Sequence, residues 1–189
     1  MEGRGIYVVN SIDDLKQTAK KICTENVIIE EFITQHPDMV FGNKSVNTIR
    51  MFTILDKHGD VHFIKGILRS GVGDTIVDNY CAGGVIYPVD VESGIVEDAG
   101  MNFLGQECVV HPGTDIVMLG YQIPHWYKVK EELTRAAKHI PSMRFVGWDV
   151  AITPDGVDII EGNHNPLFEL IEFLGKTGHY KEMLKYALD

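Results

Sequence analysis

Positive charge is scarce in this sequence of 189 residues. Lys and Arg together number 17 against 27 Asp and Glu, which gives a formal net charge of −10 at pH 7. A protein that binds nucleic acid mainly through phosphate contacts needs a basic surface, so this balance argues against nucleic acid as the main partner. The deficit is also local, because no Lys or Arg occurs between Arg69 and Lys128. We interpret this acidic, glycine-rich segment as strands and long loops around a site, with plain solvated loops as the alternative.

Cysteine and long apolar runs are also scarce. Cys23, Cys81 and Cys108 are odd in number and widely spaced, which indicates neither a disulfide framework nor a paired-cysteine metal site. No run approaches the roughly 20 apolar residues that cross a bilayer, and the first residues lack the pattern of a secretory signal. Hydrophobic residues still make up 44% of the chain, enough for a packed core. We therefore expect a soluble, globular, cytoplasmic protein without a membrane span.

Helical and strand patterns alternate irregularly along the chain. Ser11 and Asp14 form a capping pair that predicts a helix beginning at Ser11. Hairpins interleaved with helices, without a regular strand-helix-strand repeat, indicate the α+β class, with a mainly antiparallel sheet and flanking helices. The other expected elements are a buried strand Val27–Ile33, hairpins Val46–Leu55 with Val61–Leu68 and Gly84–Val91 with Gly94–Val96, a helix Trp126–Ile140, strands Val146–Thr153 and Val157–Glu161, and helices Phe168–Leu174 and His179–Leu188.

The segment from Thr153 to Val157 predicts a tight turn between the last two strands. Pro154 presets the backbone angle of the second turn position, and Gly156 accepts the left-handed position that follows. A three-residue loop of this kind closes an antiparallel pair with Thr153 opposite Val157.

This register brings two carboxylates together. Stepping back by two residues places Ala151 opposite Ile159, and the next step places Asp149 opposite Glu161. Asn163 projects from the same face and adds a neutral oxygen. The other face is expected to be a core face, and its residues are Val146, Trp148, Val150, Ile152 and Ile160.

Two like charges in a directly opposite pair destabilise a sheet unless something positive lies between them. Gly147 and Ala151 beside the acids leave room for a ligand above this face. Carboxylates and an amide oxygen suit a hard cation, so Asp149, Glu161 and Asn163 are candidate ligands of Mg²⁺ or Mn²⁺. The alternatives are that one of the acids pairs with a Lys or Arg or points to solvent.

Several segments together resemble a known family. Asp149 followed by Glu161-Gly162-Asn163-His164-Asn165-Pro166 is similar to the D…ExNxxP signature of the ATP-grasp fold, in which the Asp, Glu and Asn bind the magnesium ions that hold ATP. Ser45–Arg50, Asp78–Gly84 and Val146–Ala151 resemble the sugar-transfer-associated ATP-grasp group found beside polysaccharide biosynthesis genes. The resemblance runs from Gly3 to about Phe173.

The resemblance implies further roles in the binding of ATP. The segment Val27–Ile33 is similar to the strand and hinge that receive adenine. The implied nucleotide-binding residues are Arg4, Glu30, Glu31, Phe32 and Ile33. Asn79, Gly83 and Gly84 would form a loop that approaches a phosphate or acyl oxygen closely, since glycine lets backbone N–H groups reach an anion.

Three cations complete the set of candidate catalytic residues. Arg50 lies in a strand with apolar residues on both faces, so its charge needs an anionic partner. Lys65 and Arg69 are an even number of residues apart on a strand and therefore share a face. Together the three would neutralise a triphosphate and the charge that develops during phosphoryl transfer. Internal salt bridges to the surplus carboxylates are the alternative.

The sequence departs from the family at its beginning. The resemblance implies a lysine-bearing strand and a second lysine before the glycine-rich loop, but Glu2–Ile6 is similar only to the tail of that loop and the first lysine is Lys16. We therefore expect a single ATP-grasp-like domain over residues 1–189, truncated at its N-terminus. Either the gene or the sequence begins late, or another chain or a second copy supplies the missing lobe.

The family's usual reaction defines the expected function. It phosphorylates a small-molecule carboxylate with Mg-ATP to an acyl phosphate, which an amine or related nucleophile then captures. The resemblance adds a sugar- or peptide-linked acceptor and a place in polysaccharide or cell-envelope biosynthesis. The alternatives are a catalytically incomplete module that binds nucleotide, metal or a partner, and a metal-dependent phosphotransferase that makes no ligated product.

Overall fold

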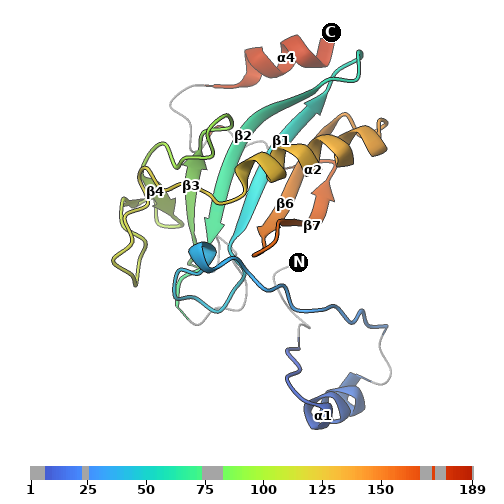
Figure 1. The fold of residues 1–189 in the computed structure, drawn as a ribbon, viewed down its shortest axis with the longest axis vertical. Coiled ribbons are helices and arrows are strands. Elements are labelled where there is room, and N and C mark those ends of the chain that lie inside the picture. Colours follow the sequence, from blue (N-terminus) through green and yellow to red (C-terminus); the bar gives the residue numbers. More distant parts are fainter. Residues whose placement is uncertain (1–6, 23–25, 74–82, 167–171, 173–177, 189) are drawn as a thin grey trace. The chain divides into compact units, whose positions relative to one another are not determined.

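The fold is described from a computed structural model, for residues 7–22, 26–73, 83–166, 172 and 178–188. The chain divides into two units, Met1–Phe32 and Ile33–Asp189, and each is described by itself (Figure 1).

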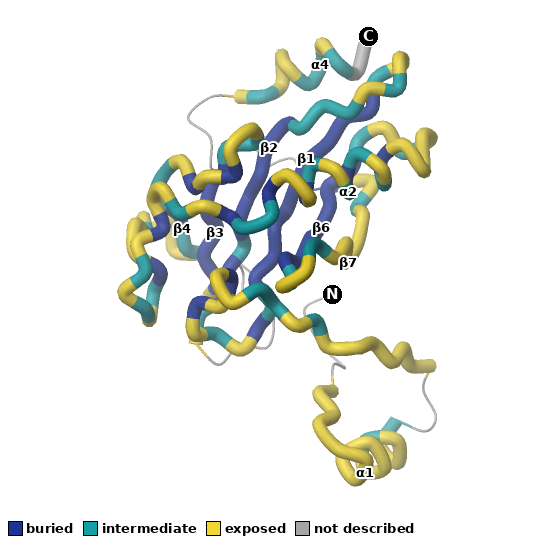
Figure 2. Tube along the Cα trace, in the orientation of Figure 1, coloured by how far each residue is buried: buried dark blue, intermediate teal, exposed yellow. Residues whose placement is uncertain are grey.

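The first unit contains one helix, α1 (Ile12–Ile22). The Ser11 hydroxyl accepts a hydrogen bond from the Asp14 N–H at 3.1 Å, which confirms the expected capping pair. No residue of α1 is buried, so its apolar stripe has no packing partner within the described residues (Figure 2).

The prediction of a buried strand over Val27–Ile33 is wrong. The segment forms no strand, and Ile28 and Ile29 are 86% and 82% exposed. A run of β-branched residues becomes a strand only when a neighbour pairs with its backbone, and none of the described strands does so.

The second unit is built on a seven-stranded antiparallel sheet in the order β5-β4-β3-β2-β1-β6-β7. Two long central strands, β1 and β2, are dark blue along most of their length in Figure 2. The α+β class and the mainly antiparallel sheet are thereby confirmed. The strands are β1 (Thr48–Leu55), β2 (Val61–Ser70), β3 (Val85–Val89), β4 (Gly100–Asn102), β5 (Glu107–Cys108), β6 (Phe145–Ile152) and β7 (Val157–Asn163).

The hairpin of β1 and β2 forms where the sequence predicts it. The Asp56 carboxylate accepts the N–H groups of His58 and Asp60 at 2.8 and 2.9 Å, and Gly59 takes the left-handed conformation that closes the turn. The hairpin expected around Gly94 is shorter, because β3 is followed by a single bridge between Val89 and Val96. The ladder of β3 instead continues to β4, which the sequence did not predict.

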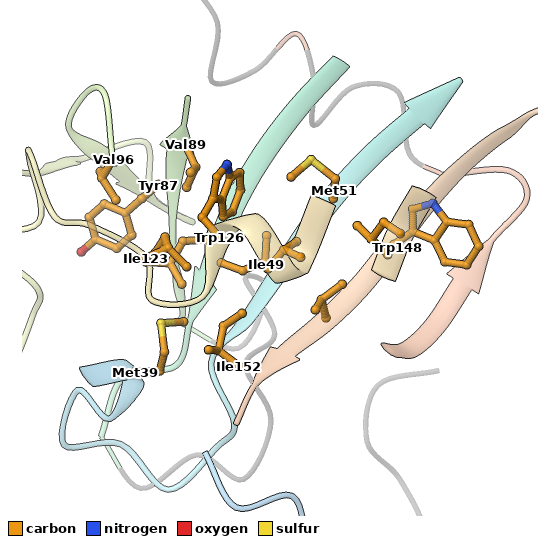
Figure 3. Close-up of a cluster of buried hydrophobic side chains, with 14 of the residues drawn as sticks. Met39, Ile49, Met51, Tyr87, Val89, Val96, Ile123, Trp126, Trp148 and Ile152 are labelled. Atoms are coloured by element: carbon orange, nitrogen blue, oxygen red, sulfur yellow. The ribbon is translucent and has the colours of Figure 1, made fainter. Parts of the chain in front are cut away.

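The main core lies between one face of the sheet and α2 (Trp126–His139). Figure 1 shows α2 lying across the central strands, and Figure 3 shows Trp126 among side chains from the sheet. The helix expected over Trp126–Ile140 is confirmed up to His139: Trp126, Val129, Leu133 and Ala137 are buried, whereas Ile140 is 44% exposed. Gly94 is required here, because any Cβ at this position would collide with the Trp126 ring and its φ is +74°.

The opposite face of the sheet is divided between a smaller apolar cluster and charged residues. Phe52, Ile54, Ile64, Ile67 and Ile86 form the cluster. Met183 and Tyr186 of α4 (Tyr180–Leu188) pack against it, which confirms the last expected helix. The helix expected over Phe168–Leu174 lies, apart from Glu172, outside the described residues. A short helix, η1 (Pro37–Met39), precedes the sheet, and no helix in the described parts is long and apolar enough to cross a membrane.

Replacing Leu133 with Ala tests the contribution of α2 to stability. Leu133 is fully buried in the main core, so we expect the free energy of unfolding to fall by about 2–5 kcal/mol. Leu104→Ala is the matched control, because Leu104 is 78% exposed and its truncation should change stability by less than about 0.5 kcal/mol. Urea denaturation followed by fluorescence measures both, and equal effects would show that α2 does not anchor the core.

Candidate functional site

The two carboxylates singled out by the sequence do face each other across β6 and β7. Asp149 is directly opposite Glu161, and Gly147 is opposite Asn163, so the candidate metal ligands lie on one face of the sheet. Glu161 is exposed, and the Asn163 amide donates to its carboxylate at 2.9 Å.

The residue pairs between the turn and the two acids differ from the predicted pairs. Val157 pairs with Ile152 rather than with Thr153, and Ala151 pairs with Asp158 rather than with Ile159. A β-bulge then shifts the ladder by one residue between Asp149 and Val150 and restores the pairing at the acids.

The bulge also changes which residues of β7 point to the core. Ile160, expected on the core face, is 46% exposed. The core face of β6 is as predicted, because Val146, Trp148, Val150 and Ile152 are all buried. The error extends from the turn to the bulge, because Val157 and Ile159 lie opposite Ile152 and Val150 on the core face, and Asp158 lies opposite Ala151 on the face of Asp149.

Asp149 lies between two arginines contributed by the central strands. Arg50 is its direct partner across the ladder of β1 and β6. The Arg50 Nε donates to one oxygen of the Asp149 carboxylate, and Nη2 donates to the other at 2.7 Å. Arg69 of β2 adds a third contact from Nη1 at 3.2 Å. The expectation that Arg50 has a carboxylate partner is therefore confirmed.

The arginines keep the Asp149 carboxyl charged despite its burial. Burial alone raises the pKa of this group, but the hydrogen bonds and charge of Arg50, together with the charge of Arg69, outweigh it and lower the pKa below its ordinary value. The repulsion expected between Asp149 and Glu161 is thus offset by guanidinium groups of the chain itself.

Lys65 takes a different partner from the two arginines. It shares their face, as expected, because Phe52 is opposite Lys65 and Thr48 is opposite Arg69. Its ammonium group is 2.5 Å from the Glu97 carboxylate and the residue is almost fully buried. The structure therefore brings Arg50 and Arg69 together at Asp149 but separates Lys65 from them.

The space above the acids is smaller than the sequence suggests. A Cβ added to Gly147 would lie 2.6 Å from the Pro166 Cβ and 3.4 Å from the Arg50 Cδ. Glycine at this position therefore accommodates Pro166 and Arg50 and leaves no gap for a ligand directly above it. The open side of the pair is that of Glu161, which is exposed.

The donor atoms fit a hard divalent cation. Two carboxylates and an amide oxygen are the ligands that Mg²⁺ accepts, with water and phosphate completing its octahedron. A carboxylate offers about four lone-pair positions, and Arg50 and Arg69 donate three hydrogen bonds to Asp149. In the described part of the chain no cluster of three or more His, Cys, Asp or Glu side chains suits a metal, so the amide of Asn163 is needed as the third ligand.

The residues predicted for the nucleotide lie in two different units or outside the described residues. Glu30, Glu31 and Phe32 belong to the first unit, whereas Ile33 begins the second. All four are outside the helices and strands. Arg4 and Asn79 lie outside the described residues, and their assignment stays a prediction.

The candidate loop glycines lie at the start of β3. Gly83 is exposed with φ +96°, and Gly84 is buried beside the strand. The positive φ of Gly83 is a conformation that favours glycine. Any contact between this loop and a phosphate stays a prediction.

A buried polar network near the end of β2 was not predicted. The Ser70 hydroxyl lies 2.8 Å from the Asn47 side-chain oxygen and 2.7 Å from His111 Nε2. Asn47 also accepts the Gly71 N–H and donates to the Met39 carbonyl. Burial lowers the pKa of His111, so the ring is neutral at neutral pH. The network ties three chain segments together, and sequence offers no local pattern that pairs residues so far apart.

Comparison with protein families matches residues 5–185 to the family described as sugar-transfer associated ATP-grasp. The match covers nearly the whole chain, so the protein belongs to this family. Membership implies an ATP-dependent activity of the ligase type, and the family typically uses ATP and Mg²⁺. Searches of curated proteins and of solved structures gave no match.

Replacing Asp149 with Asn tests the electrostatics of the cluster. At neutral pH we expect the free energy of unfolding to fall by about 3–5 kcal/mol, because two largely buried arginines lose their carboxylate. The pKa of Asp149 is lowered from 3.8, so the ion pairs stabilise fully above that value, and this contribution is lost as the pH falls through the folded-state pKa.

The difference in stability between Asp149→Asn and the native chain should therefore shrink on acidification. Urea denaturation from about pH 7 down to about pH 3 measures it. Asp155→Asn, in the exposed turn before β7, is the control and should change stability by less than about 0.5 kcal/mol. A difference that stays constant with pH would contradict the assignment.

Proposed function

We propose that this chain is an ATP- and magnesium-dependent ligase-type domain that activates a carboxylate and joins it to an amine or similar nucleophile. The observation that carries the proposal is the pairing of Asp149 with Glu161 on a charged face of the sheet, with Arg50 and Arg69 beside it. Carboxylates next to cations suit a substrate that is both anionic and metal-bound.

Asp149, Glu161 and Asn163 are the residues that would hold the cation. A bound Mg²⁺ would supply positive charge to offset the charge that develops during phosphoryl transfer. Glu161 is exposed and accepts a hydrogen bond from Asn163, so these two candidate ligands are already in contact. Asp149 is fixed by its arginines and supplies the immobile ligand.

The cations of the same face would bind the phosphates. Arg69 reaches the edge of the cluster, and Lys65 lies further along β2, where an ATP molecule would draw its ammonium group away from Glu97. In the reaction, a carboxylate oxygen attacks the terminal phosphorus of ATP and ADP leaves. The nucleophile then attacks the acyl carbon, and phosphate leaves with the bond electrons. Positive charge held on β2 stabilises both departing anions.

The substrate assignment depends on the family alone. The name of the family associates it with sugar transfer, so we propose a sugar- or peptide-linked carboxylate or acceptor in polysaccharide or cell-envelope biosynthesis. Glu30, Glu31, Phe32 and Ile33 are proposed for adenosine. Arg4, Asn79, Gly83 and Gly84 are proposed to bind the phosphates of ATP.

A second candidate function is a module that binds metal and nucleotide but needs further polypeptide for turnover. The unburied apolar stripe of α1 favours it, since an amphipathic helix is stable only when its apolar face packs against something. Additional chain, covalent or separate, would complete the first lobe. In this case the purified 189-residue chain binds Mg-ATP but hydrolyses none, and steady release of phosphate in a coupled assay would refute it.

Replacing Glu161 with Ala tests the metal site directly. The variant loses the exposed carboxylate ligand, so we expect magnesium-dependent binding of ATP to fall by at least about tenfold, a loss of about 1.4 kcal/mol. Isothermal titration calorimetry with Mg-ATP measures it. Glu161 is exposed, so folding should be unaffected.

The matched control is Glu131→Ala, which removes an exposed acid from α2, the helix on the other face of the sheet. This variant should bind Mg-ATP like the native chain. Unchanged affinity in Glu161→Ala would remove the metal site from the proposal.

A further inference from the structure

The guanidinium group of Arg50 is committed to the chain's own carboxylate. Two of its three nitrogens, Nε and Nη2, donate to the two oxygens of Asp149 in a fork-to-fork arrangement. Such bidentate pairs are the strongest and most directional ion pairs in proteins. An arginine that contacted phosphate in the same way would need these donors for the ligand.

The surroundings of Arg50 also fix its position. Arg50 and Asp149 are only 9% and 6% exposed. Their backbones are directly opposite each other on the central strands β1 and β6. The aliphatic part of Arg50 lies against Gly147, where an added Cβ would be 3.4 Å from its Cδ. Movement of the side chain away from Asp149 would leave a buried carboxylate without its main partner, which is costly.

Arg69 differs from Arg50 in each of these respects. It contacts Asp149 through one nitrogen at 3.2 Å, and its side chain is about twice as exposed, 19% against 10%. Lys65 is engaged with Glu97 instead. Arg50 thus forms a forked ion pair with Asp149, Arg69 makes a single contact with the same carboxylate, and Lys65 pairs with Glu97.

We propose that Arg50 is a positioning residue that acts through Asp149: it orients the carboxylate that binds the metal and does not contact the nucleotide. This inference rests on the proposed function, because it assigns a role within the same metal site. It separates Arg50 from Arg69 and Lys65, which remain the proposed phosphate-binding cations. The partners of metal ligands commonly set the affinity of the metal by holding the ligand in one orientation.

In this arrangement the Asp149 carboxylate would bind Arg50 and the metal ion at the same time. Oδ1 of Asp149 receives one hydrogen bond, whereas Oδ2 receives two. An oxygen of a carboxylate has about two lone pairs, and Oδ1, which accepts the bond from Arg50 Nε, is the oxygen that we assign to the cation. Arg50 therefore determines which oxygen, and which direction, is offered to the metal.

The test separates binding of the metal from binding of the nucleotide. Arg50→Lys keeps the charge but removes the fork, so the carboxylate stays neutralised and the variant should fold. Electron paramagnetic resonance of free Mn²⁺ measures the affinity for metal, and calorimetry in EDTA measures the affinity for metal-free ATP. We expect affinity for Mn²⁺ to fall by about 10–100-fold, whereas affinity for metal-free ATP should stay within about twofold.

A double-mutant cycle with Asp149→Asn shows whether Arg50 acts through Asp149. If it does, Arg50→Lys causes no further loss of Mn²⁺ affinity in the Asp149→Asn chain, because the group that it orients is already gone. Arg144→Lys is the matched control. It makes the same change in an arginine that donates to the Leu55 carbonyl at the far end of the hairpin, and it should leave both affinities unchanged.

Two results would overturn the inference, and they are distinguishable. If Arg50→Lys lowers the affinity for metal-free ATP as much as that for Mn²⁺, or if the losses add in the double variant, Arg50 contacts the nucleotide directly and only its positioning role is refuted. If Asp149→Asn binds Mn²⁺ like the native chain, or the native chain binds none, the metal site itself is wrong and the proposed function fails with it.

Discussion

The ion pair between Arg50 and Asp149 is the constraint on which the rest of the charged face depends. It joins the neighbouring strands β1 and β6, where both residues are nearly inaccessible to water. A single charge at either position would be prohibitively costly, whereas the forked pair satisfies most of the donors and acceptors of both groups. Gly147 lies beside the pair, and a Cβ there would collide with Pro166 and touch the aliphatic part of Arg50.

The two faces of the sheet make this arrangement possible. One face is held by α2 and the main core, which include Trp126, Leu133 and Trp148. The other face combines the apolar cluster under α4 with the ion pairs. Because the first face supplies most of the apolar burial, the second can carry groups that contribute little net stability. Such a division lets a small sheet hold several charges in fixed positions without losing its fold.

Local patterns were sufficient for much of the fold. The period of two along a strand predicted that Asp149 faces Glu161, although the turn pairs Ile152 with Val157 and a β-bulge restores the register at the acids. Likewise, the spacing of Trp126, Val129 and Leu133 predicted which side of α2 is buried. In these cases the deciding interaction joins residues that are close in the chain.

Apart from the pairing at the turn before β7, the failures involve partners that are far apart in the chain. An apolar run such as Val27–Ile33 says nothing of whether a neighbouring strand exists, and here none is described. The pairing of Lys65 with Glu97 and the contact of Ser70 with His111 span 32 and 41 positions. The excess of acidic residues predicted that the cations would form ion pairs with carboxylates. The order of the strands in the sheet determines which carboxylate pairs with each cation.

The bulge in β7 allows the hairpin of β6 and β7 to keep Asp149 opposite Glu161 with more than one length of turn. A three-residue turn without a bulge and the observed four-residue turn with one use the same number of residues between Asp149 and Glu161. Both arrangements leave the acids face to face. What the chain must keep is therefore the even separation of the two acids along the sequence, and the shape of the turn is free to vary.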